Sequence, residues 1–194
     1  MKAVVFDLGN VLVAYDWNGY LKSFGYSEET YRAVADAVFL SPEWELGDAG
    51  TPPDEWLRMF IANAPSYEKE IREVYEHLEK CIWTYSYTQD LINAYQAKGY
   101  KVYYLSNYSE WIFEKTKDTL SFLDVFDGGI FSYRAKCIKP GSEIYRKLIQ
   151  KYDLIPEETL FFDDREDNVE AAANLGFAAV VFTEETALKA LHSM

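Results

Sequence analysis

The stretch that decides the fold is Ala3-Val4-Val5-Phe6-Asp7-Leu8-Gly9-Asn10, close to the N-terminus. Its first four residues form an uninterrupted apolar run, which is typical of a strand buried on both faces of a parallel sheet. Asp7 ends this run, and Gly9-Asn10 is a turn signal. The stretch therefore predicts a buried strand with a carboxylate at its carboxyl end.

Similar runs recur along the chain. Strands are predicted over residues 100–105, 129–132, 159–162 and 178–182. Between them, amphipathic patterns predict helices over residues 89–98, 142–152 and 168–175. Strands that alternate with helices of this length imply right-handed crossovers. The fold class is therefore predicted to be α/β, with a doubly wound, Rossmann-like parallel sheet.

Residues 17–87 have a different pattern, because they contain no convincing strand. Helical patterns cover residues 17–24, 27–40, 53–62 and 67–84. We therefore predict an all-helical cap inserted after the first strand. This organisation gives a core domain of residues 1–16 and 88–194 and a cap domain of residues 17–87.

Composition excludes several classes of protein. The 194 residues carry 19 Lys and Arg against 32 Asp and Glu, a formal net charge of -13. This excess of acid argues against nucleic acid and anionic membrane surfaces as partners. No apolar stretch is long enough to span a membrane, and the N-terminal run is too short for a signal peptide, so we expect a cytoplasmic protein. Cys81 and Cys137 lack metal-binding spacing and are expected to be free thiols.

Polar residues gather where the predicted strands end. Asp7, Ser106 and the pair Asp163-Asp164 each follow a strand, and Lys139 lies in a loop before a predicted helix. Ligands of parallel α/β sheets bind outside the carboxyl ends of the strands. A carboxylate can attack phosphorus, Mg²⁺ prefers oxygen ligands, and a Lys with a hydroxyl can hold the transferring phosphoryl group. This set of side chains therefore points to phosphoryl transfer.

The same residues carry a family resemblance. Four motifs occur in order: Phe6-Asp7-Leu8-Gly9-Asn10-Val11-Leu12, Leu105-Ser106-Asn107, Lys139-Pro140 and Phe161-Phe162-Asp163-Asp164-Arg165-Glu166-Asp167-Asn168. With them the chain resembles the haloacid dehalogenase superfamily, and within it the α-D-glucose-1-phosphate phosphatase-like members, which have a helical cap after the first motif. The resemblance covers residues 1–16 and about 88–185.

The resemblance implies a role for each motif residue. Catalysis is assigned to Asp7, Ser106 and Lys139, substrate binding to Ser106, Asn107 and Lys139, and Mg²⁺ binding to Asp7, Gly9, Asp163 and Asp164. Asp7 is implied to be the nucleophile, and Asp163 to hold a metal-bound water. Asn168 is implied to brace the metal-binding loop. The expected activity is a magnesium-dependent phosphatase that acts on a small phosphorylated metabolite, such as a sugar phosphate, through an aspartyl phosphate.

One position departs from the family pattern. Most phosphatases of this superfamily have an Asp two positions after the nucleophile as general acid and base, and here that position is Gly9. Asp16 or a cap residue such as Glu45 or Asp48 could replace it, or the leaving group could depart unaided. The chain could also be a weakly active or non-catalytic relative. Asp16 has a structural alternative, because it is placed as a helix N-cap.

Two other classes are weighed against this interpretation. A receiver domain of a two-component system has similar residues, but its acid pair comes first, whereas here the single Asp7 comes first and Asp163-Asp164 last. A hydrolytic 2-haloacid dehalogenase shares Asp7, Ser106 and Lys139 but needs no Mg²⁺. The Asp163-Asp164 pair would then be unexplained.

Overall fold

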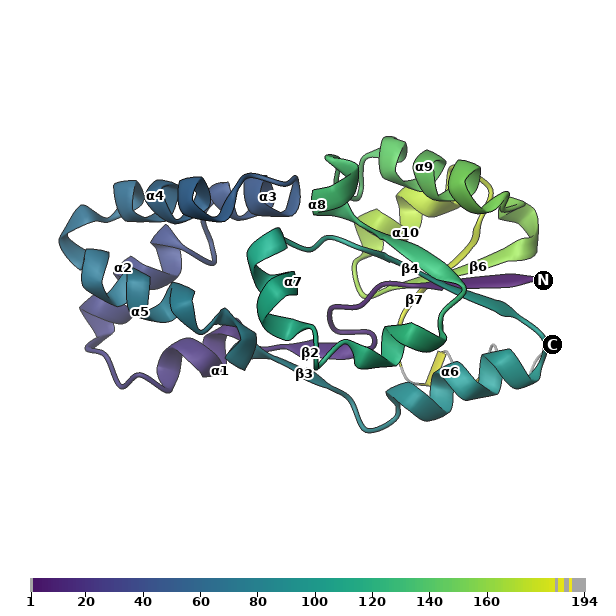
Figure 1. Ribbon diagram of the computed structural model, residues 1–194, viewed down its shortest axis with the longest axis horizontal. Coiled ribbons are helices and arrows are strands. Elements are labelled where there is room, and N and C mark those ends of the chain that lie inside the picture. The colour runs from purple at the N-terminus through teal and green to yellow at the C-terminus, as the bar shows by residue number, and fades with distance from the viewer. Residues whose placement is uncertain (1, 184, 187–188, 190–194) are drawn as a thin grey trace.

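The computed structural model describes residues 2–183, 185–186 and 189, and its centre is a parallel sheet (Figure 1). The strand order is β5-β4-β1-β6-β7. The strands are β1 (Ala3–Phe6), β4 (Lys101–Ser106), β5 (Gly128–Phe131), β6 (Thr159–Asp163) and β7 (Ala178–Val181). All neighbouring pairs in this sheet are parallel. The predicted doubly wound sheet is confirmed, and Asp7 follows its middle strand.

Alternation along β1 divides the core into two apolar layers. Val4 and Phe6 pack in one buried cluster and Val5 in the other, because successive side chains of a strand point to opposite faces. Figure 1 shows α6 on one side of the sheet and α9 and α10 on the other. The bounds are α6 (Thr88–Ala97), α9 (Ser142–Tyr152) and α10 (Glu166–Ala173). Burial on both faces explains why β1 has no polar residue before Asp7.

Five helices follow β1 and form a separate group, drawn at the left of Figure 1. They are α1 (Trp17–Lys22), α2 (Glu28–Ala37), α3 (Glu43–Asp48), α4 (Pro53–Asn63) and α5 (Glu68–Glu76), and we call them the cap helices. Buried aromatic side chains fill the space between them. Trp56 contacts Phe60 at a ring-centroid distance of 4.9 Å and Tyr75 at 5.7 Å. Short 3₁₀ turns follow at Pro65–Tyr67 and Leu78–Cys81.

The prediction that residues 17–87 contain no strand is wrong at their C-terminal end. The helix expected to reach Thr84 ends at Glu76, and β3 (Ile82–Thr84) pairs antiparallel with β2 (Val13–Tyr15). Ile82-Trp83-Thr84 is rich in β-branched and aromatic residues, which suit strands. A three-residue strand is too short for its periodicity to show. The cap helices are therefore joined to the rest of the chain through a two-stranded ribbon.

Three helices have no counterpart in the sequence prediction: α3, α7 (Glu110–Thr116) and α8 (Ser132–Ala135). Each is too short for a clear amphipathic repeat. Further 3₁₀ turns are Ser121–Val125 and Pro156–Glu158. Trp111 of α7 donates a hydrogen bond to the carbonyl of Tyr75 at 2.9 Å, which ties α7 to the cap helices.

Two further predictions can be compared with the described residues. Cys81 and Cys137 are free thiols, as expected. In the part of the chain that the structure describes, no helix is long and apolar enough to cross a membrane. The division into core and cap domains stays a prediction, and residues 190–194 of the predicted core range lie outside the described residues.

Candidate active site

Three carboxylates meet at the carboxyl ends of the two central strands. Asp7 follows β1, while Asp163 ends β6 and is followed by Asp164. Each of them offers an oxygen, and these oxygens all lie within 4.8 Å of one another. The parallel register holds them together, because the Asp7 N–H donates to the carbonyl of Phe162 at 2.8 Å.

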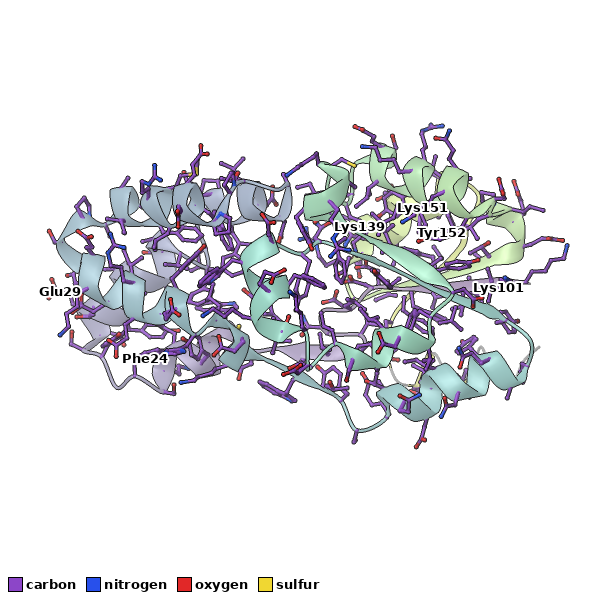
Figure 2. All side chains as sticks on the ribbon, viewed as in Figure 1. Phe24, Glu29, Lys101, Lys139, Lys151 and Tyr152 are labelled. Atoms are coloured by element: carbon purple, nitrogen blue, oxygen red, sulfur yellow. The ribbon has the colours of Figure 1, made fainter. Side chains whose placement is uncertain are left out.

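A buried lysine lies against this carboxylate cluster. The Lys139 Nζ is 2.8 Å from Asp7 Oδ1 and 2.6 Å from Asp163 Oδ2, and the side chain is 1% exposed. Figure 2 labels Lys139 in the loop between α8 and α9, close to the sheet. Burial alone lowers the pKa of an ammonium, but Asp7 and Asp163 together raise the pKa of Lys139 above its ordinary value. Lys139 is therefore a fixed cation.

The Asp7 carboxyl group is in a strained electrostatic position. Burial, together with the neighbouring Asp163 and Asp164, raises its pKa from 3.8 to about 7 against the lowering effect of Lys139. Three carboxylates face one ammonium, so the cluster carries an uncompensated negative charge. A divalent cation would remove this imbalance.

The donor set fits magnesium. Carboxylate and carbonyl oxygens are the ligands that Mg²⁺ prefers, and it is usually bound by one or two carboxylates while it keeps several waters. Asp164 is partly exposed at the cavity and Gly9 lines the same cavity, so both are accessible to an ion. Asp163 differs, because it is fully buried and engages Lys139.

Asp163 is held from both sides. Its Oδ1 accepts hydrogen bonds from the Arg165 N–H at 3.0 Å and from Asn168 Nδ2 at 2.9 Å, while Oδ2 accepts from Lys139. Tyr145 in turn donates to the backbone carbonyl of Asn168 at 2.9 Å. The structure thus brings Asn168 to the loop that it is predicted to brace.

Ser106, which ends β4, and Asn107, which follows it, have different surroundings. Both polar atoms of the Asn107 carboxamide bond the backbone of Lys139, so this side chain holds the lysine loop. The Ser106 hydroxyl lines the cavity, and within the described residues its one hydrogen bond is a long contact of 3.5 Å with the Asn107 carbonyl. A hydrogen bond of that length is weak, so the hydroxyl is available to a ligand.

Asn10 was not predicted as a site residue. It adopts a positive φ of 55° in the turn after Gly9, and its Nδ2 donates to Asp164 Oδ2 at 3.1 Å. Asn tolerates this left-handed conformation better than most residues. The Gly9-Asn10 turn signal was visible in the sequence, but its partner across 154 residues was not.

Two adjoining cavities of about 400 and 320 Å³ open beside the cluster. Both are lined by Asp7, Asn107, Arg165, Tyr15, Trp17, Trp44 and Asp48, so the core and the cap helices each contribute. A larger cavity of about 500 Å³ lies at the edge strand β5, away from the three carboxylates. The convergence of polar groups therefore places the candidate site at the first two cavities.

The residues that could replace the general acid and base absent at Gly9 differ in their position relative to the two cavities. Asp16 is the N-cap of α1, where its Oδ1 accepts a hydrogen bond from the Gly19 N–H at 2.8 Å, and it does not line either cavity. The N-cap alternative for Asp16 is therefore supported. Glu45 and Trp44 both line the smaller cavity, but Glu45 is exposed. Asp48, at the end of the unpredicted α3, is buried and lines both cavities.

Known proteins resemble the chain over nearly its whole length. A model of the haloacid dehalogenase-like hydrolases matches residues 1–176. A sesquiterpene phosphatase of Aspergillus oryzae is 25% identical over 189 residues, covering 96% of this chain and 92% of that protein. D-ribitol-5-phosphate phosphatase of Bacteroides thetaiotaomicron is 27% identical over 202 residues, covering 91% and 89%. A crystal structure of an enzyme from the same bacterium, in complex with magnesium and inorganic phosphate, matches with a TM-score of 0.72, 23% identity and 94% coverage of each chain.

Proposed function

Because the chain belongs to the haloacid dehalogenase-like hydrolases, we propose that it is a magnesium-dependent phosphatase acting through an aspartyl phosphate on Asp7. The observation that carries the proposal is the convergence of Asp7, Asp163 and Asp164 beside the buried Lys139. Two relatives of this chain are phosphatases by name, which supports the same reaction class.

The roles proposed for the side chains follow from their positions. Asp7 attacks phosphorus, since it lines the cavity at the end of β1. Lys139 and Ser106 bind the phosphoryl oxygens, because one is a fixed cation and the other has a free hydroxyl. Asn107 keeps Lys139 in place.

Magnesium is proposed as the cofactor. Asp7, Asp164 and the Gly9 carbonyl would hold the ion, with Asp163 acting through a water. Its chemistry is to offset the repulsion between an anionic nucleophile and an anionic substrate. The relative crystallised with magnesium and phosphate supports this choice of ion.

The substrate is proposed to be a small phosphorylated metabolite. Aromatic and aliphatic residues form an apolar part of the cavity wall: Val13, Tyr15, Trp17, Trp44, Ile82 and Ile112. This wall favours a substrate whose non-phosphate part is apolar or stacks on aromatic rings. The sugar phosphate expected from the sequence stays a prediction, and the two named relatives are a sesquiterpene phosphatase and a D-ribitol-5-phosphate phosphatase.

A direct assay tests the proposal. The purified chain is incubated with p-nitrophenyl phosphate, with Mg²⁺ or with a chelator, and separately with 2-chloropropionate. We expect phosphate release only with Mg²⁺, and acid-quenched protein should carry phosphate on Asp7. Release of chloride without Mg²⁺ would instead support a dehalogenase. Absence of both activities would support a non-catalytic relative.

A further inference from the structure

Cleavage of an unactivated phosphate ester needs a proton at the leaving oxygen, because an alkoxide is a poor leaving group. Within the described residues, the carboxyl groups that line the two cavities are those of Asp7, Asp48, Asp164 and the exposed Glu45. Asp7 is the proposed nucleophile, and Asp163 is engaged on both oxygens. Asp164 belongs to the proposed metal site and accepts a hydrogen bond from Asn10. Asp48 is the remaining buried carboxyl group.

Asp48 is held firmly by its backbone. The Ser132 hydroxyl donates to the Asp48 carbonyl at 2.6 Å and accepts from the Tyr108 N–H at 2.9 Å, which fastens the end of α3 to the core. On the other side, Trp56 packs on Gly47 so closely that an added Cβ would lie 2.3 Å from its ring. The position of Asp48 is therefore determined by both the core and the cap helices.

The Asp48 side chain, in contrast, is uncommitted. It is 9% exposed and lines both cavities together with Asp7. Among the described residues, no hydrogen bond or ion pair reaches its carboxyl group. The carboxyl group is therefore accessible from the cavities that Asp7 also lines, and no partner in the described part of the chain competes with a ligand for it.

The surrounding groups keep this carboxyl group protonated at neutral pH. Burial, Glu45 of the same helix and Asp7 raise the pKa of Asp48 from 3.8 to about 8, against the lowering effect of Lys139. Tyr15 and Tyr108 also face it, and their own pKa values are raised. A neutral carboxylic acid that lines the same cavities as the nucleophile can donate a proton.

We propose that Asp48 is the general acid and general base of the reaction, in place of the carboxyl group that Gly9 lacks. The inference rests on the proposed phosphatase function. In the first step an Asp7 oxygen bonds to phosphorus, the bond from phosphorus to the leaving oxygen breaks, and that oxygen takes the Asp48 proton. In the second step the Asp48 carboxylate takes a proton from water as the water oxygen attacks phosphorus. The bond to Asp7 then breaks, which releases inorganic phosphate and returns Asp48 to its neutral form.

The first experiment compares phosphate esters of graded leaving-group pKa. For Asp48→Asn, we expect kcat/KM with alkyl phosphates to fall about 100-fold or more. With p-nitrophenyl phosphate kcat/KM should change little, because that leaving group departs without a proton. Its kcat should still fall, and phosphorylated protein should accumulate, because water attack lacks its base. Asp36→Asn makes the same substitution at an exposed position on α2 and should match the wild type throughout.

The second experiment introduces a carboxylic acid at Gly9, close to the nucleophile, into the Asp48→Asn variant. A Cβ at Gly9 meets no atom within 4 Å, so the backbone there has room for the first atom of a side chain, and Gly9→Asp is the variant of choice. Adding Gly9→Asp to Asp48→Asn should recover part of the activity with alkyl phosphates. Asp48→Glu, which keeps the acid, should retain a weak dependence on leaving-group pKa even if Asp48→Asn folds poorly.

The outcomes are distinguishable. If the wild type hydrolyses no phosphate ester, the proposed function fails. If it does, and folded Asp48→Asn shows the wild-type dependence on leaving-group pKa, or Asp48→Glu shows a steep one, the assignment of Asp48 is overturned. An equal loss with all esters, without accumulation of phosphorylated protein, would also overturn it, since that pattern indicates a substrate-binding or structural role.

Discussion

The Asn107 carboxamide forms two hydrogen bonds with the backbone of Lys139. Its Oδ1 accepts from the Lys139 N–H at 2.8 Å, and its Nδ2 donates to the Lys139 carbonyl at 3.0 Å. These bonds join the end of β4 to the loop before α9. The lysine ammonium, which contacts Asp7 and Asp163, is thus positioned from a neighbouring strand.

Asn107→Ala removes both of these bonds and leaves backbone groups unpaired. We expect a loss of about 1–3 kcal/mol in the free energy of unfolding, measured in urea. Activity should fall more than this loss explains, because a displacement of Lys139 by about 1 Å can lower the rate about 100-fold. Asn93→Ala, at an exposed position of α6, serves as the control. Wild-type kinetics in Asn107→Ala would contradict the positioning role.

Asp7→Asn replaces the proposed nucleophile by an amide of nearly the same shape. The amide cannot form an acyl phosphate, so activity should fall below about a tenth of wild type, while the folded structure persists. Steady-state hydrolysis of p-nitrophenyl phosphate and circular dichroism measure the two effects. Higher residual activity, with a folded protein, would rule out Asp7 as the nucleophile.

The two neighbouring carboxylates are expected to act differently when removed. Asp164 is partly exposed, so Asp164→Ala should lose Mg²⁺ affinity with little change in the unfolding free energy of the metal-free protein. Asp163 is fully buried against Lys139, and removing one partner of such a pair costs about 3–5 kcal/mol. Magnesium titrations and urea unfolding of both variants measure these effects. If Asp163→Ala lost more Mg²⁺ affinity and Asp164→Ala lost more unfolding free energy, the metal-binding and structural roles of the two residues would be exchanged.

The raised pKa of Asp48 predicts how stability depends on pH. The folded chain keeps the Asp48 proton to about pH 8, whereas the unfolded chain releases it near 3.8. The stability of the folded state that comes from this pKa difference is complete below about pH 4, and it is lost as the pH rises through 8. Asp48→Asn cannot titrate, so its melting temperature relative to wild type should rise between pH 5 and pH 8.5 without metal. A constant difference would show that Asp48 titrates normally.

The aromatic cavity wall predicts a dependence on the substrate. Trp17 lines both cavities and stacks on Phe39 at a ring-centroid distance of 5.1 Å. Trp17→Ala should raise KM about tenfold for phosphates of apolar alcohols, because about 1–2 kcal/mol of apolar burial is lost. KM for a phosphate ester too small to reach the wall should be unchanged. Equal effects on both substrates would place the bound substrate elsewhere.

The five parallel strands could be predicted because apolar residues dominate each of them and the helical patterns lie between them. The motif residues could be predicted to converge, since the carboxyl ends of parallel strands share one edge of the sheet. Their contacts confirm this for Asp7, Lys139 and Asp163. Both inferences use local patterns that do not depend on distant partners.

The features missed by the sequence prediction depend on distant partners. The strand at Ile82–Thr84 forms only because Val13–Tyr15 lies beside it, and three residues carry no readable period. Asp48 was one of several cap acids in the sequence. Its backbone carbonyl accepts a hydrogen bond from the Ser132 hydroxyl, which is 84 residues away. No pattern within a short window contains that information.

The ribbon of β2 and β3 means that nucleophile and proposed proton donor are carried by separate parts of the chain, one before it and one between its strands. Exchange of the whole segment between the two strands, by recombination or by design, would alter substrate preference and proton supply in a single event. A chimaera with a foreign segment that lacks an acid at this position is therefore expected to accept new esters but to cleave only those with good leaving groups. Activity toward alkyl phosphates would return once Gly9 is changed to Asp in the same chimaera.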